Sequence, residues 1–159
     1  MFHINVVLFQ PEIPQNTGNI ARTCAAVGAT LHLVKPLGFS VRDKHLKRAG
    51  LDYWDLVKII YYENISEFFY INSKENLFFI TKTASQAYDE ADYSSNVFLI
   101  FGKETTGLPS DILNEHRKRC YRIPMKGDSR SLNLSNAVAI IVYEVMRQNG
   151  FSGLKLHGG

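Results

Sequence analysis

The stretch INVVLFQPEIPQNTGNIARTCAAV, residues 4–27, decides the fold class of this chain. It opens with a short run of mostly β-branched and aromatic residues, passes through a loop with two prolines and ends in a helix-like segment. A buried strand that leads through a loop into a helix is the unit from which parallel sheets are built. The stretch therefore predicts a chain that starts as a strand and continues as a helix.

The same alternation continues toward the C-terminus. Short apolar runs bounded by turn residues predict buried strands at Ile4–Phe9, Leu31–Val34, Val57–Tyr62, Leu77–Thr81 and Val97–Phe101. Helix-like segments follow at Thr17–Val27, Asp43–Ala49 and Ile65–Ile71, and a last apolar helix ends at Gly150. Strands that alternate with helices favour an α/β fold, a parallel sheet with helices on both faces.

The length of the chain sets the domain organisation. With 159 residues, one core is the natural size and a second independent domain would be cramped. Neither an internal repeat nor a linker rich in Pro, Gly or Ser divides the sequence. We expect a single domain over residues 1–150, followed by a flexible tail at 151–159.

Composition bears on location. The apolar fraction of 45% and the charged fraction of 21% are ordinary for globular proteins, and no apolar run is long enough for a membrane span. The first apolar run has no basic leader and soon meets Pro and Glu, which argues against a signal peptide. We expect a cytoplasmic protein without a membrane partner.

Cysteines and histidines give no sign of a metal site. Cys24 and Cys120 are far apart and neither belongs to a CxxC pair, so we expect two small buried residues. The five histidines are scattered along the sequence. The net charge is only +3, but cations cluster over 42–48 and 117–122, either as solvated faces or as surfaces for phosphate groups.

Loops that follow the strands of an open parallel sheet are the places to look for a site. In the first, PEIPQNTGNIAR, either Asn16 or Thr17 could cap the coming helix, and Arg22 lies further inside it. Asn16 and Arg22 are six positions apart and do not share one helical face, yet both could reach one cleft. Alone, they are better explained as a helix cap and a surface arginine.

The second loop lies in LIFGKETTGLPSDIL, residues 99–113. Gly102 and Gly107 would let the backbone approach a flat ligand, and Glu104 is either a binding residue or a capping or salt-bridge residue. The sequence lacks the spacing of a phosphate-binding Walker loop and has no GxGxxG after a strand. A conventional nucleotide-binding fold is therefore not indicated.

The third loop lies in IPMKGDSRSLNLSNAVAIIVYE, residues 123–144, just before the last helix. Ser131, Asn133, Ser135 and Asn136 offer more polar groups than a helix cap uses. We expect Ser131 and Asn133 to face a ligand. No GxSxG or HExxH motif accompanies them, so hydrolase and metalloenzyme functions lack support.

Together, EIPQNTGNIAR, FGKETTGLP and the third stretch resemble the three motifs of the SPOUT superfamily of RNA ribose methyltransferases. LVKPLGF and LKRAGLDYW, residues 33–39 and 46–54, add a similarity to the small tRNA (cytidine/uridine-34)-2'-O-methyltransferases of the TrmL type. The resemblance extends from about residue 4 to residue 150. It implies a C-terminal trefoil knot in the α/β fold, S-adenosylmethionine as methyl donor, no metal, a homodimer that shares its active sites, and the anticodon stem-loop of tRNA as substrate.

The resemblance also implies roles for particular residues. Cofactor contacts would come from the main chain of Phe79 and Ile80, and from Gly102, Ile123, Ser131 and Leu132. Catalytic and substrate-positioning roles would fall to Arg22, Asn16, Ser131, Asn133 and Glu104. Lys103 and Thr106 depart from the usual Pro and Arg of this family's second motif, which exchanges one cation at the mouth of the site for another nearby.

The implied reaction is 2'-O-methylation of the ribose of the wobble nucleotide, position 34 of tRNA. Since arginine does not normally act as a base, we expect Arg22 to stabilise a developing alkoxide or a backbone phosphate. Alternatives are methylation of another RNA such as rRNA, a non-catalytic RNA-binding protein of the same fold and, last, a purely structural domain.

Overall fold

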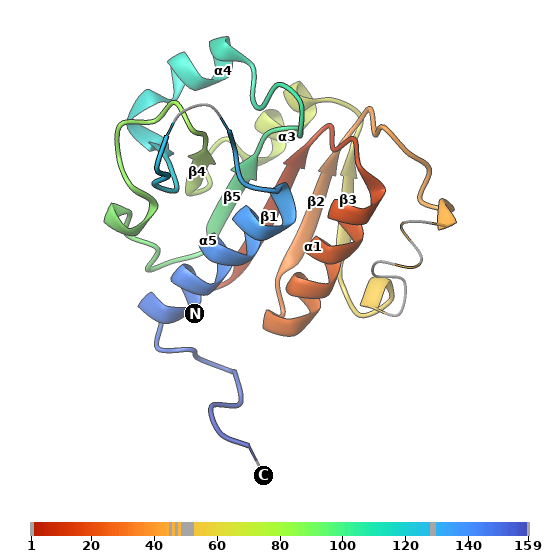
Figure 1. The fold of residues 1–159 in the computed structure, drawn as a ribbon, viewed down its shortest axis with the longest axis vertical. Coiled ribbons are helices and arrows are strands. Elements are labelled where there is room, and N and C mark those ends of the chain that lie inside the picture. The colour runs from red at the N-terminus through yellow and green to blue at the C-terminus, as the bar shows by residue number, and fades with distance from the viewer. Residues whose placement is uncertain (1, 45, 47, 49–52, 128–129, 159) are drawn as a thin grey trace.

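A six-stranded sheet runs through the centre of the structure, a computed structural model that describes residues 2–44, 46, 48, 53–127 and 130–158 (Figure 1). All of its strand pairs are parallel, and the strand order is β3-β2-β1-β5-β4-β6. The five predicted strands are confirmed. The strands are β1 (Ile4–Phe9), β2 (Thr30–Val34), β3 (Ile59–Tyr62), β4 (Leu77–Ile80), β5 (Val97–Phe101) and β6 (Cys120–Tyr121).

The sixth strand was not predicted. It is only two residues long, so it has no periodic pattern, and it exists because Cys120 and Tyr121 pair with Phe79 and Ile80. Strand β3 begins two residues later than the predicted start at Val57. Both cysteines are free and buried, as the sequence predicts.

Helices cover both faces of the sheet. On one face lie α1 (Pro14–Val27) and α5 (Leu134–Gln148), and on the other lie α3 (Ile65–Asn72) and α4 (Ser110–Glu115). Alternate residues of β1 divide between these layers: Val6 packs in one core with Ile20 and Ile141, and Val7 in the other with Phe68. The predicted parallel α/β architecture is therefore confirmed, and the knot stays a prediction.

Helix α1 begins earlier than its sequence pattern suggests. Its N-cap is Ile13, its first residue is Pro14, and no side chain of the cap residue closes the helix end. The predicted cap at Asn16 or Thr17 is wrong, because proline at the first helical position has a backbone already suited to the helix. Thr17 is instead fully buried, and its hydroxyl has no hydrogen-bond partner among the described residues.

The predicted basic helix at Asp43–Ala49 falls partly outside the described residues. Of its positions, 44, 46 and 48 are helical, and Leu46 is fully buried. Residues 45, 47 and 49 lie outside the described part of the chain, so this prediction is only partly tested.

The last helix stops at Gln148, with Asn149 as its C-cap and Gly150 in the left-handed conformation at φ 66°. The predicted stop at Gly150 is thus met within two residues. Beyond it, Phe151 and Leu154 pack against the core that α5 helps to form. The expected domain end at residue 150 and the flexibility of the tail stay predictions.

Four buried polar side chains form a cluster on the face of the sheet that α3 covers. The two ring nitrogens of His32 contact the hydroxyl of Tyr62 at 2.8 Å and Oδ1 of Asn5 at 2.9 Å. Asn72 donates to the same Tyr62 hydroxyl at 3.3 Å. Burial lowers the pKa of His32 from 6.5 to about 4, helped by the nearby charges of His3 and Lys58. His32 is therefore neutral at neutral pH, and we call these four residues, Asn5, His32, Tyr62 and Asn72, the buried cluster.

Candidate active site

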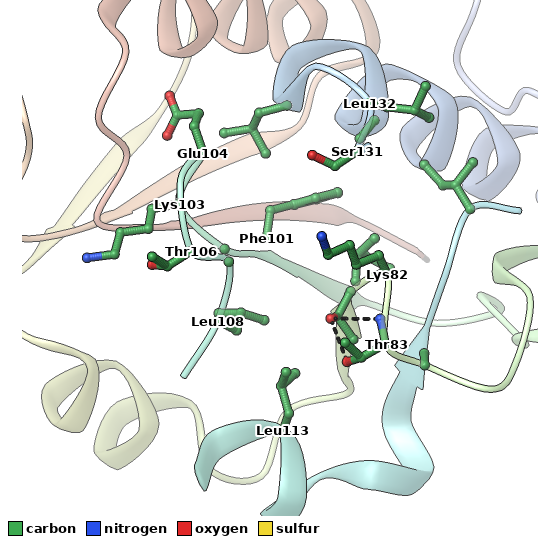
Figure 2. Close-up of a pocket in the computed structure, with 18 of the residues that line it drawn as sticks. Lys82, Thr83, Phe101, Lys103, Glu104, Thr106, Leu108, Leu113, Ser131 and Leu132 are labelled. Atoms are coloured by element: carbon green, nitrogen blue, oxygen red, sulfur yellow. Dashed lines mark hydrogen bonds between the residues drawn. The ribbon is translucent and has the colours of Figure 1, made fainter. Parts of the chain in front are cut away.

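The carboxyl ends of β1, β4, β5 and β6 meet at one edge of the sheet, where a cavity of about 810 Å³ opens. Figure 2 shows part of its lining, with side chains that converge from several loops. The lining includes residues 80–85 after β4, 101–108 at and after β5, and 131–134 at the start of α5, together with Ile13 and Asn16 after β1. The three loops singled out from the sequence therefore surround one space.

The cavity has an apolar side and a polar side. Ile80, Leu108 and Leu113 give flat aliphatic surface, which suits a ring system or an aliphatic ligand group. Thr81 and Thr83 give hydroxyls that contact each other at 3.0 Å (Figure 2). The combination suits a ligand with an apolar body and several polar groups.

Glu104 joins the loop after β5 to the start of helix α1. Its Oε1 accepts a hydrogen bond from the backbone N–H of Glu12 at 2.9 Å, and its Oε2 accepts one from that of Ile13 at 2.8 Å. Oε2 also accepts from the side-chain amide of Asn16 at 3.2 Å. A carboxylate at this place satisfies free N–H groups at a helix start and faces the positive end of the helix dipole. Glu104 thus performs the capping that the sequence assigned to Asn16 or Thr17.

Glu12 makes the return connection. Its Oε1 accepts from the backbone N–H of Thr105 at 3.0 Å and from the Thr105 hydroxyl at 2.7 Å. These hydrogen bonds lower the pKa of Glu12, and the charge of Lys103 adds to the effect. Each loop therefore holds the other through a carboxylate. We call Glu12, Ile13, Asn16, Glu104 and Thr105 the loop clasp.

The loop after β5 is closed by an unusually tight backbone contact. A Cβ on Gly102 would lie 2.2 Å from the carbonyl carbon of Gly107 and 2.3 Å from the nitrogen of Leu108, closer than real Cβ contacts come. Gly107 has φ +69° and donates its N–H to the carbonyl of Lys103 at 2.9 Å. Gly102 thus permits a close backbone approach within the loop, whereas the predicted approach of both glycines to a flat ligand stays a prediction.

Asn133 and Ser131 differ in their roles at the start of α5. Asn133 is the N-cap, and its Oδ1 accepts from the N–H groups of Ser135 and Asn136 at 2.9 and 3.4 Å and from the Ser135 hydroxyl at 2.6 Å. Ser131 lies just before the helix and lines the cavity, as Figure 2 shows. Of this pair, Ser131 is the one left to meet a ligand through its hydroxyl, while the Asn133 carbonyl is engaged in the cap.

Most of the predicted site residues lie together. The cavity is lined by Asn16, Ile80, Gly102, Glu104, Ile123, Ser131, Leu132 and Asn133. Phe79 does not line it; its side chain is fully buried and stacks on His116 with 4.5 Å between the ring centroids. The binding and catalytic roles of these residues stay predictions.

Arg22 lies away from the cavity. It is exposed on α1, and its guanidinium stands 5.0 Å from the ring centroid of Tyr53. Asn16, six residues earlier, is about 120° away around the helix at 3.6 residues per turn. The two residues therefore do not converge on one cleft within a single copy of the chain.

The second basic cluster divides between the site and the sheet. Arg117 lines the cavity. Arg119 instead donates to the carbonyl of Leu77 at 3.0 Å and covers the ring of Phe78, 4.4 Å from its centroid. Only part of this cluster is therefore available to a phosphate group.

Three residues of the loop clasp, Glu12, Ile13 and Thr105, were not predicted from the sequence. Glu12 and Thr105 contact each other across 93 positions, and nothing local in the sequence links them. Lys82, which also lines the cavity, was missed because the loop after β4 carries no motif. Only knowledge that β1 and β5 are neighbouring parallel strands could have predicted that the loops after them meet.

The described residues offer neither a cluster of metal ligands nor a membrane-spanning helix. They contain no group of three or more His, Cys, Asp or Glu side chains placed to hold a metal ion. Among the same residues, no helix is long and apolar enough to cross a membrane.

Comparison with known proteins gives a consistent result. The model of the SpoU rRNA Methylase family matches residues 3–143. A protein of Escherichia coli K12 that is named tRNA (cytidine(34)-2'-O)-methyltransferase is 44% identical over 154 residues, which are 96% of this chain and 98% of that one. A Geobacillus stearothermophilus protein, provisionally given the same name, is 56% identical over 154 residues, or 95% of this chain and 98% of its own length.

Solved structures agree with these relatives. A structure from work on the 2-OH methylation of C/U34 on tRNA has a TM-score of 0.88 and 41% identity, and the match covers 94% of this chain and 97% of that one. An AdoMet-bound rRNA methyltransferase from Sinorhizobium meliloti has a TM-score of 0.82 and 29% identity, over 91% of this chain and 56% of the other.

Proposed function

The chain belongs to the SpoU rRNA methylase family, and on this premise we propose that it transfers a methyl group from S-adenosylmethionine to the ribose 2'-hydroxyl of nucleotide 34, a cytidine or uridine derivative, in tRNA. The observation that carries the proposal is the convergence of all three sequence motifs on one cavity. We infer that it works in the cytoplasm, where its substrate is found, and that residues 1–150 form the catalytic domain.

Sequence identity favours tRNA over rRNA as substrate. The chain is 44% identical to the E. coli tRNA methyltransferase but only 29% identical to the S. meliloti rRNA methyltransferase. Methylation of rRNA remains the second candidate because the family and one structural neighbour are named for it.

The cavity fits the proposed cofactor in size and in chemistry. Its volume of about 810 Å³ lies within the range of small-molecule sites, roughly 300–1,000 Å³. Ile80, Leu108 and Ile123 would hold the adenine ring, and Ser131 with backbone groups of residues 102 and 132 would hold the polar parts. Bound S-adenosylmethionine supplies a methyl group on a positively charged sulfur, which needs no metal to activate it.

The residues of the chain then have to place the ribose. A well-oriented reactant can gain ~7 to 11 kcal/mol over reaction in solution, so positioning is the main contribution expected of the site. Asn16, held against Glu104, would direct its amide group toward the ribose or its phosphate. Because Glu104 already accepts hydrogen bonds at both oxygens, we assign it to positioning rather than to proton transfer.

Arg22 would act on the cavity of a second copy of the chain. It is exposed and lies outside its own cavity, although the family resemblance implies a place for it at the reacting ribose. In a homodimer, exposed apolar residues on α5, Ile140 and Tyr143, would form part of the interface. The guanidinium carries a permanent positive charge, so it would stabilise a developing alkoxide or the adjacent phosphate.

The function is tested by nucleoside mass spectrometry of tRNA from cells with and without the gene. Loss of the 2'-O-methyl group at position 34 is the expected result. A matching assay uses purified protein with an anticodon stem-loop RNA and the same RNA with deoxyribose at position 34, which should accept no methyl group. Unchanged tRNA together with altered rRNA would favour the second candidate.

The role of Arg22 is tested by mixing two inactive variants. Arg22→Ala lacks the guanidinium, and a Ser131→Tyr variant has a filled cavity with an intact Arg22. If active sites are shared, mixed dimers regain activity because one site combines an open cavity with a wild-type Arg22. Mixtures that stay as inactive as the separate variants would contradict a shared site.

A further inference from the structure

A second groove lies at the same edge of the sheet as the cavity, beyond the carboxyl ends of β2 and β3. It is open to solvent, with a volume of about 730 Å³. Leu37, Phe39, Val41 and Tyr61 give it an apolar and largely aromatic wall. The segment that carries Leu37 to Val41 leaves the sheet from the arrowhead end of β2, shown in orange in Figure 1.

The aromatic wall is not covered by the described residues. Tyr61 is 40% exposed and Val41 is 39% exposed, whereas the neighbouring Tyr62 is buried at 3%. An aromatic side chain exposed in a concave surface is a common feature of sites that bind flat rings. The groove therefore presents a stacking surface to solvent.

A cation stands beside this surface. The Lys35 ammonium lies 5.8 Å from the centroid of the Tyr61 ring and 3.1 Å from a carboxylate oxygen of Glu63. Both partners of this ion pair are solvent-exposed, at 41% and 74%, and such pairs contribute little and exchange partners readily. Exposed Arg42, Lys44 and Arg48 follow in the sequence. Lys35 and these three cations outnumber the single carboxylate of Glu63, and an excess of positive charge suits an anionic polymer.

The groove is fixed relative to the cavity. Gly38, between Leu37 and Phe39, donates its N–H to the carbonyl of Pro11 at 2.9 Å. A Cβ on Gly38 would lie 2.7 Å from Cα of Glu12, so the two loops touch without room for a side chain. Since Glu12 belongs to the loop clasp, a ligand in the groove would sit at a defined distance from the cavity.

We propose that this groove binds an unpaired nucleobase of the RNA substrate, stacked on Tyr61, with the adjoining phosphate at Lys35. The proposal rests on the function proposed above, and it assigns the base to a nucleotide near the methylated one. Single-stranded RNA is commonly held by bases stacked on aromatic side chains next to a basic surface. Strands lie ~4.8 Å apart, so β5 and the β2–β3 pair are about 10 to 15 Å from each other, a reach of neighbouring nucleotides.

The first test compares Tyr61→Ala, Tyr61→Phe and a matched control, Tyr70→Ala. Tyr70 lies on α3, is 87% exposed and does not line the groove, so its truncation removes the same kind of side chain without changing the groove wall. Binding of a fluorescent anticodon stem-loop RNA is measured by anisotropy. We expect Tyr61→Ala to weaken binding about 5- to 100-fold, as loss of a base–aromatic stack does, and both Tyr61→Phe and Tyr70→Ala to bind like wild type.

Methyl transfer and cofactor binding separate this role from a general defect. In Tyr61→Ala the KM for RNA should rise by a similar factor, with kcat at saturating RNA and calorimetric affinity for S-adenosylmethionine unchanged. If Tyr61→Ala binds RNA as Tyr70→Ala does, the proposal is wrong. A change in sedimentation of the free protein with unchanged RNA binding would also overturn it, and would make the groove a protein interface.

The second test identifies the base. A set of stem-loops, each with one abasic loop nucleotide, is bound to wild type and to Tyr61→Ala. One abasic position should weaken wild type but leave Tyr61→Ala unaffected, because the stack is already lost. Equal losses for both proteins at every position would contradict the assignment. Wild-type methyl transfer in the same experiment reports separately on the proposed function, since RNA binding is measured without the reaction.

Discussion

The loop clasp and the buried cluster are two polar networks on the same sheet, and they solve opposite problems. The clasp lies at the carboxyl edge and is built on two carboxylates, Glu12 and Glu104, that accept hydrogen bonds from backbone N–H groups. The buried cluster lies within the hydrophobic layer beneath α3 and contains no charge at neutral pH. Charge is kept where water and a ligand reach it, and only neutral groups occupy the interior.

The difference teaches which network can serve a reaction. The clasp positions loops and lines a cavity, so its geometry bears on ligand binding. In the buried cluster, His32 and Tyr62 have their polar atoms paired with other members, and none of the four residues lines the cavity. Changes in the clasp should therefore affect activity, whereas changes in the buried cluster should affect stability.

The largest loss of stability is expected from filling the tight backbone contact at Gly102, in the loop after β5. In Gly102→Ala the new methyl group would meet backbone atoms of Gly107 and Leu108, which cannot rotate away. We expect a loss of about 3 kcal/mol or more in unfolding free energy, the upper end for overpacking, and no measurable cofactor binding. Calorimetric melting should shift down by roughly 10 °C.

Gly127→Ala is the matched control for this change, because a Cβ at Gly127 meets nothing within 4 Å. It should melt and bind cofactor like the wild type. Equal melting temperatures for the two alanine variants would contradict the close contact at Gly102.

The buried cluster should make the unfolding free energy depend on pH in the acid range. His32 has its pKa lowered from 6.5 to about 4 by burial, so between these values the unfolded chain binds a proton that the native chain does not. Stability should therefore fall as pH drops from 6.5 to 4, by roughly 3 kcal/mol at 1.36 kcal/mol per pKa unit. Urea unfolding at a series of pH values measures this loss, and His32→Gln should flatten the curve over that window.

The clasp has a different acid window. The pKa of Glu12 is lowered below its ordinary 4.5, so its contribution is complete above that pH and is lost as the pH falls further. The two networks can thus be separated in one titration. The same slope between pH 6.5 and 4 in wild type and His32→Gln would show that another group is responsible.

A smaller effect on stability, but a clear one on activity, is expected from Glu104→Gln. The amide can accept at one oxygen only, so its NH2 group would face an N–H donor of Glu12 or Ile13. We expect a loss of about 1 to 2 kcal/mol in unfolding free energy, together with a reduced kcat for methyl transfer because Asn16 loses its fixed position.

Thr105→Val gives the comparison for Glu104→Gln. It removes one exposed hydroxyl donor to Glu12 but keeps both carboxylates and the backbone bond. Its cost should be about 0.5 to 1 kcal/mol, with activity close to wild type. If Thr105→Val reduced kcat as much as Glu104→Gln, the assignment of Glu104 as the residue that positions Asn16 would be wrong.

The sequence predicts the sheet because its strands are short, apolar and bounded by turn residues. That the three polar loops share one site is implied by the family resemblance, because the strand pattern alone leaves the order of the strands open. The sequence does not predict β6, whose two residues are a strand only through pairing with β4. The start of α1 was misplaced because its cap comes from Glu104, far away in the sequence.

Side-chain roles were harder to predict than positions. Asn133 and Ser131 look alike as polar residues before a helix, and only the hydrogen bonds of Asn133 identify it as the cap. Arg22 was expected to reach the same cleft as Asn16 from another face of the helix, but it lies outside the cavity that Asn16 lines. Local patterns give the element that carries a residue, whereas the direction of a side chain depends on contacts between distant segments.

The clasp also has a consequence for synthesis of the protein. Its contacts span 88 to 93 positions, so a growing chain that has produced β1 and α1 lacks the carboxylate that caps this helix. Until residue 104 has been made, the backbone N–H groups of Glu12 and Ile13, just before α1, lack this carboxylate partner. The loop clasp can therefore close only after the ribosome has delivered the central strand β5 and the loop behind it.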